Sequence, residues 1–103
     1  MNSKPGMGIQ ELLSDKREEI LQIAANHGAF NVRVFGSVAR GEADEDSDID
    51  FLIDCDYTQV SPWFPGGLVL DLEQLLERKV DVATEAALKE RIRERVLQEA
   101  IIL

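Results

Sequence analysis

The chain has 103 residues, of which 45% are hydrophobic and 30% are charged, and its formal net charge is −9. This composition predicts one soluble globular domain, and the negative charge argues against a nucleic-acid partner because it repels phosphates. No apolar stretch is long enough to span a membrane, so no membrane partner is expected, and a single cysteine predicts a reducing, cytoplasmic location. A mononucleotide carried by magnesium stays compatible with this charge, because the metal supplies positive charge.

Residues 1–8 form a lead-in without a regular pattern, and residues 9–103 are predicted to form a single domain. Apolar residues recur at helical spacing over residues 9–27. Within this segment Asp15 and Glu18 have the spacing of a capping box, which would divide it into a short helix and a longer one.

Strands and helices then alternate along the chain. Alternating and β-branched residues predict strands over residues 31–35, 48–55 and 79–83, and helical spacing predicts helices over residues 68–78 and 88–103. The last helix would turn its charged residues to solvent and six apolar residues inward, namely Leu88, Ile92, Val96, Leu97, Ala100 and Ile101. This order of elements predicts a small α/β (α+β) domain in which helices cover a short sheet.

A Gly-Ser pair ends the first predicted strand, and a short helix is predicted directly after it, over residues 37–40. Free backbone N–H groups at a helix start favour an anion, glycine lets a phosphate approach the backbone, and the Ser37 hydroxyl adds a donor. Arg40 lies one turn further, and its guanidinium would reach the same phosphate. The same pair is common where a tight turn merely caps a helix, so Gly36 and Ser37 alone leave both interpretations open.

The second predicted strand opens with Asp48 and Asp50. Residues i and i+2 of a strand project from the same face, so both carboxylates would share one face while Ile49, Phe51 and Ile53 face the core. Two carboxylates this close repel each other unless a cation lies between them, and magnesium binds such oxygen ligands together with substrate phosphates. Other Asp-x-Asp pairs occur in this acidic chain, so a solvated surface pair is the competing interpretation.

A calcium-binding EF-hand loop is the other metal site to consider, because Asp44, Asp46 and Asp48 occupy alternate positions. The sixth position of such a loop requires glycine and the twelfth requires glutamate, but Ile49 and Cys55 stand there. The calcium site is therefore rejected.

Asp81 lies between Val80 and Val82 in the last predicted strand. If the valines face the core, its carboxylate projects from the opposite face, the one assigned to Asp48 and Asp50. On neighbouring strands the three acids would converge, either to bind two magnesium ions or to leave Asp81 as the base that takes a proton from an attacking hydroxyl. An exposed acid at a strand end is the alternative.

Together these motifs resemble the nucleotidyltransferase superfamily related to DNA polymerase beta. Gly36-Ser37, ten intervening residues and Asp48-x-Asp50 reproduce its signature. Residues 34–43 (Val-Phe-Gly-Ser-Val-Ala-Arg-Gly-Glu-Ala) and 47–53 (Ser-Asp-Ile-Asp-Phe-Leu-Ile) look like its minimal, stand-alone branch, the MntA-type antitoxins, and residues 79–82 resemble the strand with the third acid. The resemblance covers residues 9–103 and implies a polymerase beta-like core, a short mixed sheet flanked by helices.

The resemblance implies a role for each matching residue. Gly36 and Ser37 would hold the triphosphate of ATP, Asp48 and Asp50 would bind magnesium, and Asp81 would complete the three acids that hold two Mg²⁺ ions. The implied reaction transfers AMP from ATP to a tyrosine of a HEPN ribonuclease toxin encoded nearby. The chain would then be a protein adenylyltransferase and an antitoxin, and it would form a hetero-oligomer with its toxin.

Two other functions stay open from the sequence. The first is a catalytically weak antitoxin that neutralises its partner by complex formation through its acidic surface, although a complete set of three acids argues against it. The second is a transferase that acts on a small molecule such as an aminoglycoside. It is less favoured because no second domain is evident to hold that substrate.

Overall fold

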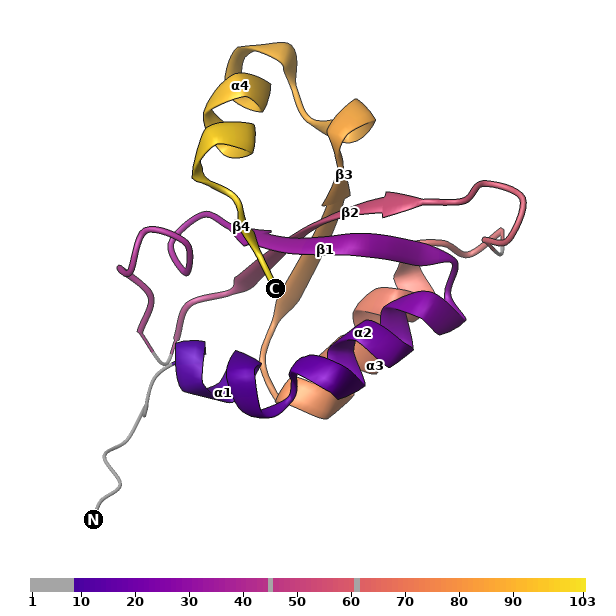
Figure 1. Cartoon of the computed structure of the whole chain (residues 1–103), viewed down its shortest axis with the longest axis horizontal. Coiled ribbons are helices and arrows are strands. Elements are labelled where there is room, and N and C mark those ends of the chain that lie inside the picture. The colour runs from indigo at the N-terminus through magenta and orange to yellow at the C-terminus, as the bar shows by residue number, and fades with distance from the viewer. Residues whose placement is uncertain (1–8, 45, 61) are drawn as a thin grey trace.

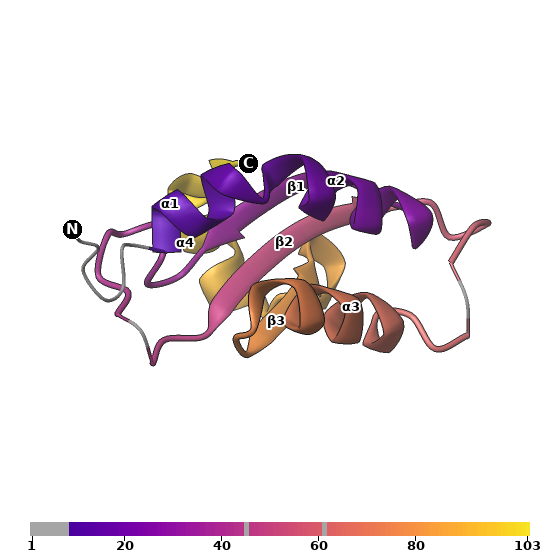
Figure 2. The same ribbon diagram turned by 90° about the horizontal axis from the view of Figure 1, so that it is seen from below.

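The computed structural model describes residues 9–44, 46–60 and 62–103, and the predicted lead-in at residues 1–8 lies outside them. Figure 1 shows helices on both faces of a sheet, and Figure 2 views one of these faces from below. The elements are, in chain order, α1 (Ile9–Asp15), α2 (Arg17–Asn26), β1 (Ala29–Phe35), β2 (Ile49–Cys55), α3 (Gly66–Leu76), β3 (Val80–Thr84), the 3-10 turn η1 (Glu85–Ala87), α4 (Glu90–Glu99) and β4 (Ile101–Ile102).

The strands in the described part of the chain form one mixed sheet in the order β3-β2-β1-β4. β1 runs antiparallel to both β2 and β4, whereas β2 and β3 are parallel and are connected through α3. β1, β2, β3 and α3 begin and end within two residues of their predicted bounds. The predicted fold class, a short mixed sheet flanked by helices, is therefore confirmed.

The main core lies between the sheet and the helices α1, α2 and α3. Alternate residues of β2, namely Ile49, Phe51 and Ile53, are at most 1% exposed and pack in one cluster with Ile20 of α2 and Leu72 of α3. The predicted register of β2 is therefore confirmed, and the side chains between these three project to the other face. Over the described ranges, helices long and apolar enough to cross a membrane are absent.

A smaller apolar cluster covers part of the other face. Leu52 of β2 packs there with Leu88 and with Val96 of α4. Asp50 and Asp54 precede and follow Leu52 at alternate positions, so they project from the same face on either side of this cluster. We call this side of the sheet the α4 face; Asp50 lies toward one of its ends and Asp54 toward the other.

The break in the first helical segment is confirmed, but the predicted capping box does not form. α1 ends at Asp15 and α2 begins at Arg17, with Lys16 at the N-cap position and no side-chain hydrogen bond there. The Lys16 N–H donates to Leu12 O at 3.0 Å, and Lys16 O accepts from the Ile20 N–H at 2.8 Å. Because these backbone bonds continue across the junction, the break needs no side-chain cap.

The last helix is shorter than predicted. α4 ends at Glu99, and residues Ile101–Ile102 form β4 on the outer edge of β1. Leu97 and Ile101, both predicted to face inward, are 38% and 48% exposed. Two β-branched isoleucines favour an extended backbone, and the free edge of β1 offers them hydrogen-bond partners, so strand pairing replaces the last helical turn.

Candidate active site

Gly36 lies where β1 ends, directly beside Asp50 of β2. Phe35, the last residue of β1, is the register partner of Asp50, and Gly36 follows with a left-handed φ of +72°. A Cβ atom at Gly36 would collide with the Asp50 carboxylate. A side chain at this position would have to displace the carboxylate, so glycine favours this close approach, and the contact joins the two sequence motifs into one site.

Residues 37–40 form turns, so the predicted short helix is wrong. The Arg40 N–H donates to Gly36 O at 3.1 Å, but the Gly41 N–H bonds only three residues back and the helical pattern stops. Gly36 and Gly41 flank the segment with φ values of +72° and +74°, and such left-handed residues end helices. Ser37 is half-buried next to Gly36, and Arg40 is exposed.

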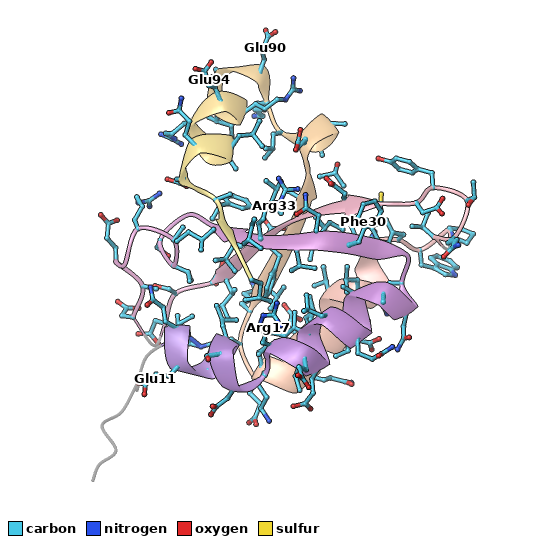
Figure 3. The ribbon with its side chains drawn as sticks, viewed as in Figure 1. Glu11, Arg17, Phe30, Arg33, Glu90 and Glu94 are labelled. Atoms are coloured by element: carbon cyan, nitrogen blue, oxygen red, sulfur yellow. The ribbon has the colours of Figure 1, made fainter. Side chains whose placement is uncertain are left out.

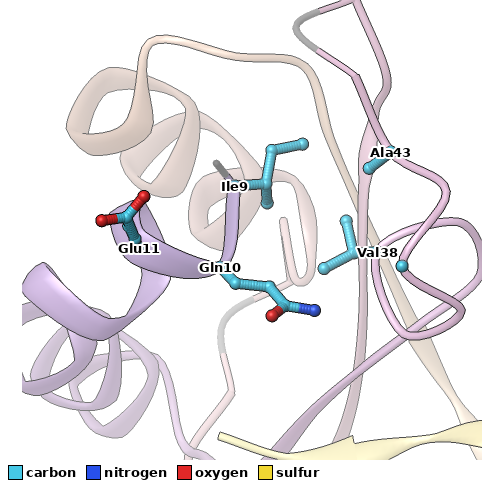
Figure 4. A pocket seen from close by; sticks show the side chains of 6 residues that line it. Ile9, Gln10, Glu11, Val38 and Ala43 are labelled. Carbon is cyan, nitrogen blue, oxygen red and sulfur yellow. The ribbon is translucent and has the colours of Figure 1, made fainter. Parts of the chain in front are cut away.

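A hollow of about 360 Å³ lies between α1 and this loop (Figure 4). Ile9 and Gln10 of α1 line one side of it, and Val38, Gly41 and Ala43 line the other. Val38 is buried in the main core, so it anchors the loop there. None of the predicted site residues in the described chain lines this hollow. We interpret the hollow as part of the structure that supports the loop.

The three predicted acids come from the start of β2 and from β3. Asp50 and Asp81 are register partners on these parallel strands. Val80 and Val82 are buried in the main core, whereas Asp81 between them is exposed on the α4 face. Asp48 is exposed just before β2 begins. The structure therefore brings Asp81 next to Asp50, with Asp48 two residues away along the chain.

Partial burial, together with crowding of negative charge, raises the pKa of the Asp50 carboxyl. Partial burial is the largest cause, and the charges of Asp81, Asp48 and Glu99 add to it, while the charge of Arg40 opposes it. A cation beside Asp50 would relieve both the burial cost and the repulsion. The electrostatics of the site therefore favour a bound cation.

The carboxylate ligands fit magnesium, although they are not already arranged around an ion. Carboxylates on one face offer the hard oxygen ligands that Mg²⁺ takes, and Mg²⁺ usually completes its shell with water and substrate phosphates. In the described residues, no three or more His, Cys, Asp or Glu side chains are arranged to hold a metal ion. The predicted ligands Asp48, Asp50 and Asp81 would therefore turn toward the ion as it binds.

Glu99, the last residue of α4, contacts the Gly-Ser loop, although it was predicted to face solvent. The Gly36 N–H donates to Glu99 Oε2 at 2.8 Å, and Arg40 Nη1 donates to Glu99 Oε1 at 3.2 Å. The Glu99 side chain is only 17% exposed. Helical spacing could have indicated that Glu99 faces inward, because Glu99 follows the buried Val96 by three residues and shares its side of the helix.

Comparison with known proteins agrees with this geometry. Residues 17–103 match the family described as the nucleotidyltransferase domain. The protein adenylyltransferase MntA of Thermococcus cleftensis is 35% identical to this chain over 95 residues, which are 90% of this chain and 90% of that protein. The family match and this relative therefore cover nearly the same part of the chain as the fold described above.

Two solved structures share the fold. One assigned as a minimal nucleotidyltransferase has a TM-score of 0.78 and 49% identity, and the match covers 90% of this chain and 94% of that chain. The crystal structure of a toxin–antitoxin with AMP-PNP has a TM-score of 0.67 at 20% identity, over 85% of this chain and 69% of that chain, a likeness of fold alone. The predicted polymerase beta-like fold and enzyme class are confirmed, and the chain belongs to the nucleotidyltransferase domain family as one of its minimal members.

Proposed function

We propose that the protein is a magnesium-dependent adenylyltransferase that moves AMP from ATP to a hydroxyl group, namely a tyrosine hydroxyl of a cognate HEPN ribonuclease toxin in the cytoplasm. The contact of Gly36 with Asp50 carries this proposal, because it sets an anion-binding loop against carboxylates suited to a metal. The relative MntA is named a protein adenylyltransferase, which supports a protein as the acceptor. The chain would then act as the antitoxin of a toxin–antitoxin pair.

In the proposed reaction the acceptor oxygen attacks the α-phosphorus of ATP, and the bond from this phosphorus to the oxygen that bridges to the β-phosphorus breaks. Pyrophosphate leaves, and the hydroxyl proton passes to a carboxylate. Asp81 is suited to accept it, because Asp81 is exposed to an incoming acceptor and lies beside Asp50.

Each motif has its own part in this proposal. The Gly36 N–H, the Ser37 hydroxyl and the Arg40 guanidinium would bind the triphosphate. Asp48 and Asp50, together with Asp81, would hold magnesium, which when bound supplies positive charge to the leaving pyrophosphate. Because Gly36 touches Asp50, the bound phosphates and the carboxylates would meet at one point.

Replacing Asp50 tests the proposal. We expect Asp50→Asn to lower the rate of AMP transfer on the order of a hundredfold or more, the usual effect of removing one electrostatic stabiliser of a transition state. The measurement is the intact mass of the toxin encoded beside this chain, followed over time with ATP and magnesium. Asp46→Asn is the matched control, because it removes the same charge from the exposed segment before β2.

The outcomes separate two functions. A toxin that gains adenylyl units rapidly with the wild type and with Asp46→Asn, but slowly with Asp50→Asn, supports the proposal. Wild-type rates with Asp50→Asn would refute the assigned site. A stable complex in which the toxin keeps its mass would instead indicate an antitoxin that acts by binding, as a net charge of −9 would allow toward a basic partner.

A further inference from the structure

Glu99 occupies the place where the proposed function requires a phosphate. We infer that the Glu99 carboxylate is a built-in competitor of the nucleotide: it holds the Gly36 N–H and the Arg40 guanidinium in the nucleotide-free protein and has to leave before a triphosphate binds. The inference rests on the proposed function, because that function assigns the nucleotide to this loop.

Two kinds of anion-binding donor converge on the Glu99 carboxylate. The Gly36 N–H lies 2.8 Å from Oε2, and Arg40 Nη1 lies 3.2 Å from Oε1 and 3.4 Å from Oε2. A backbone N–H beside a left-handed glycine and a forked guanidinium are donors that proteins use to bind phosphate. In this structure an internal carboxylate satisfies both donors.

Glu99 and a triphosphate cannot share the Gly36 N–H. The Gly36 N–H has a single hydrogen, and Glu99 accepts it. The Glu99 carboxylate on these donors would also repel phosphates that approach them, because like charges repel. Binding of a triphosphate at this loop therefore requires the Glu99 side chain to turn away.

The backbone around Glu99 is fixed, which leaves its side chain as the moving part. The Ala100 N–H donates to Val96 O at 2.9 Å and closes the last turn of α4, and Val96 is buried against Leu52. Directly afterwards β4 pairs with β1, the strand that ends before Gly36. Rotation of the Glu99 side chain would free the Gly36 N–H and Arg40 Nη1 without any shift of α4, while Arg40 Nε keeps its bond to Glu42 Oε1 at 3.0 Å.

The expected consequence is a weakened apparent affinity for nucleotide. When a site is competent in only a fraction of the molecules, the apparent dissociation constant rises in inverse proportion to that fraction. Removing the Glu99 carboxylate makes every molecule competent, so its loss should tighten nucleotide binding. A residue that merely supported the loop would have the opposite effect, because its loss would disorder the donors.

Titration calorimetry with α,β-methylene ATP, which cannot transfer its AMP, tests this in the presence of magnesium. We expect Glu99→Gln to bind the analogue about tenfold more tightly than the wild type, the change for a contact closed in roughly nine of ten molecules. Glu94→Gln is the matched control, because Glu94 is an exposed glutamate of the same helix that extends into solvent (Figure 3). Its affinity should equal that of the wild type.

The amide resonance of Gly36 gives a second measurement that does not depend on catalysis. In nitrogen-edited NMR spectra of the nucleotide-free protein, Glu99→Gln should shift the Gly36 amide, and Glu94→Gln should leave it in place. A Gly36 amide unaffected by Glu99→Gln would overturn the inference, and so would an affinity equal to or weaker than that of the wild type. Glu99→Ala, which removes the acceptor altogether, should shift the same resonance at least as far.

The two proposals fail in different ways. If the wild type transfers AMP and Glu99→Gln binds the analogue no better, the competitor role is wrong and the proposed function stands. If neither the wild type nor Glu99→Gln binds the analogue, the nucleotide site itself is wrong, and the competitor role falls with it.

Discussion

The two ends of the α4 face both carry acidic side chains, but they differ in how that charge is balanced. At one end Arg33, which is 8% exposed, donates to Asp54 at 3.0 Å and to Glu85 at 3.3 Å; Figure 3 shows Arg33 on β1. At the other end lie the acids of the candidate site. No ion pair among the described residues involves Asp48, Asp50 or Asp81.

The contrast distinguishes a structural acid from a functional one on the same strand. Asp54 and Asp50 are four residues apart in β2 and project from the same face. Asp54 has an internal cation, so its charge is satisfied without a ligand. Asp50 has a raised pKa and acidic neighbours, so its charge is best satisfied by a cation from outside. The unbalanced negative charge around Asp50, more than the residue type, therefore distinguishes the functional acid from the structural one.

The largest expected effect comes from Gly36→Ala, which breaks the contact between the loop and Asp50. The new Cβ would collide with the Asp50 carboxylate, so the loop or the carboxylate has to move. We expect AMP transfer to fall by about a hundredfold or more, because displacing reacting groups by an ångström has effects of that size. The measurement is the rate at which labelled AMP is transferred to the proposed toxin.

Gly41→Ala is the matched control for that experiment. Gly41 has a φ of +74°, close to the +72° of Gly36, but a Cβ there would meet nothing within 4 Å. Gly41→Ala therefore brings the same backbone strain without the collision, and it should keep much more of the activity. Equal losses in the two variants would show that backbone strain, and not the approach to Asp50, explains the glycine.

At the opposite end, Arg33→Met is expected to change stability and not chemistry. The substitution leaves Asp54 and Glu85 without their buried cation, and we expect the free energy of unfolding to fall by about 1–2 kcal/mol, since both acids stay partly solvated. Urea unfolding measures this change. Arg95→Met, at an exposed position of α4, should change stability far less. Loss of AMP transfer in folded Arg33→Met would contradict the separation of the two ends.

Local patterns predict much of this molecule. The alternation of Ile49, Phe51 and Ile53 predicts both the strand and its buried face, because burial on one side of a sheet imposes a period of two. The same reasoning places Asp81 on the face opposite its two valine neighbours. These predictions succeed because each depends only on residues next to one another in the chain.

Contacts between distant segments are the part that local patterns miss. The bond from Gly36 to Glu99 joins residues 63 positions apart. Helical spacing places Glu99 on the side of the buried Val96, but no local pattern identifies Gly36 as its partner. The end of α4 was also missed, because the choice between one more helical turn and strand pairing at Ile101 depends on the free edge of β1. The predicted helix after Gly36 does not form for a local reason, the second left-handed glycine at Gly41.

The smallest expected effect tests the unbalanced charge directly. Without magnesium, Asp50→Asn should raise the free energy of unfolding at pH 7, by less than Arg33→Met lowers it. The pKa of Asp50 is raised in the folded protein, by burial first and then by Asp81 and Asp48, so the folded state holds the proton more tightly than the unfolded state does. The stability from this group is therefore present below its ordinary pKa and is lost as the pH rises through the raised folded value.

Urea unfolding of the wild type and Asp50→Asn across the acid and neutral range measures this difference. The advantage of Asp50→Asn should vanish in acid, where the wild-type carboxyl is protonated as well. Asp54→Asn should behave in the opposite way and lower stability at pH 7, because it breaks the pair with Arg33. Magnesium should stabilise the wild type more than Asp50→Asn, because a ligand that binds only the folded state stabilises that state. Equal responses to magnesium would show that Asp50 does not hold the metal, whatever its pKa.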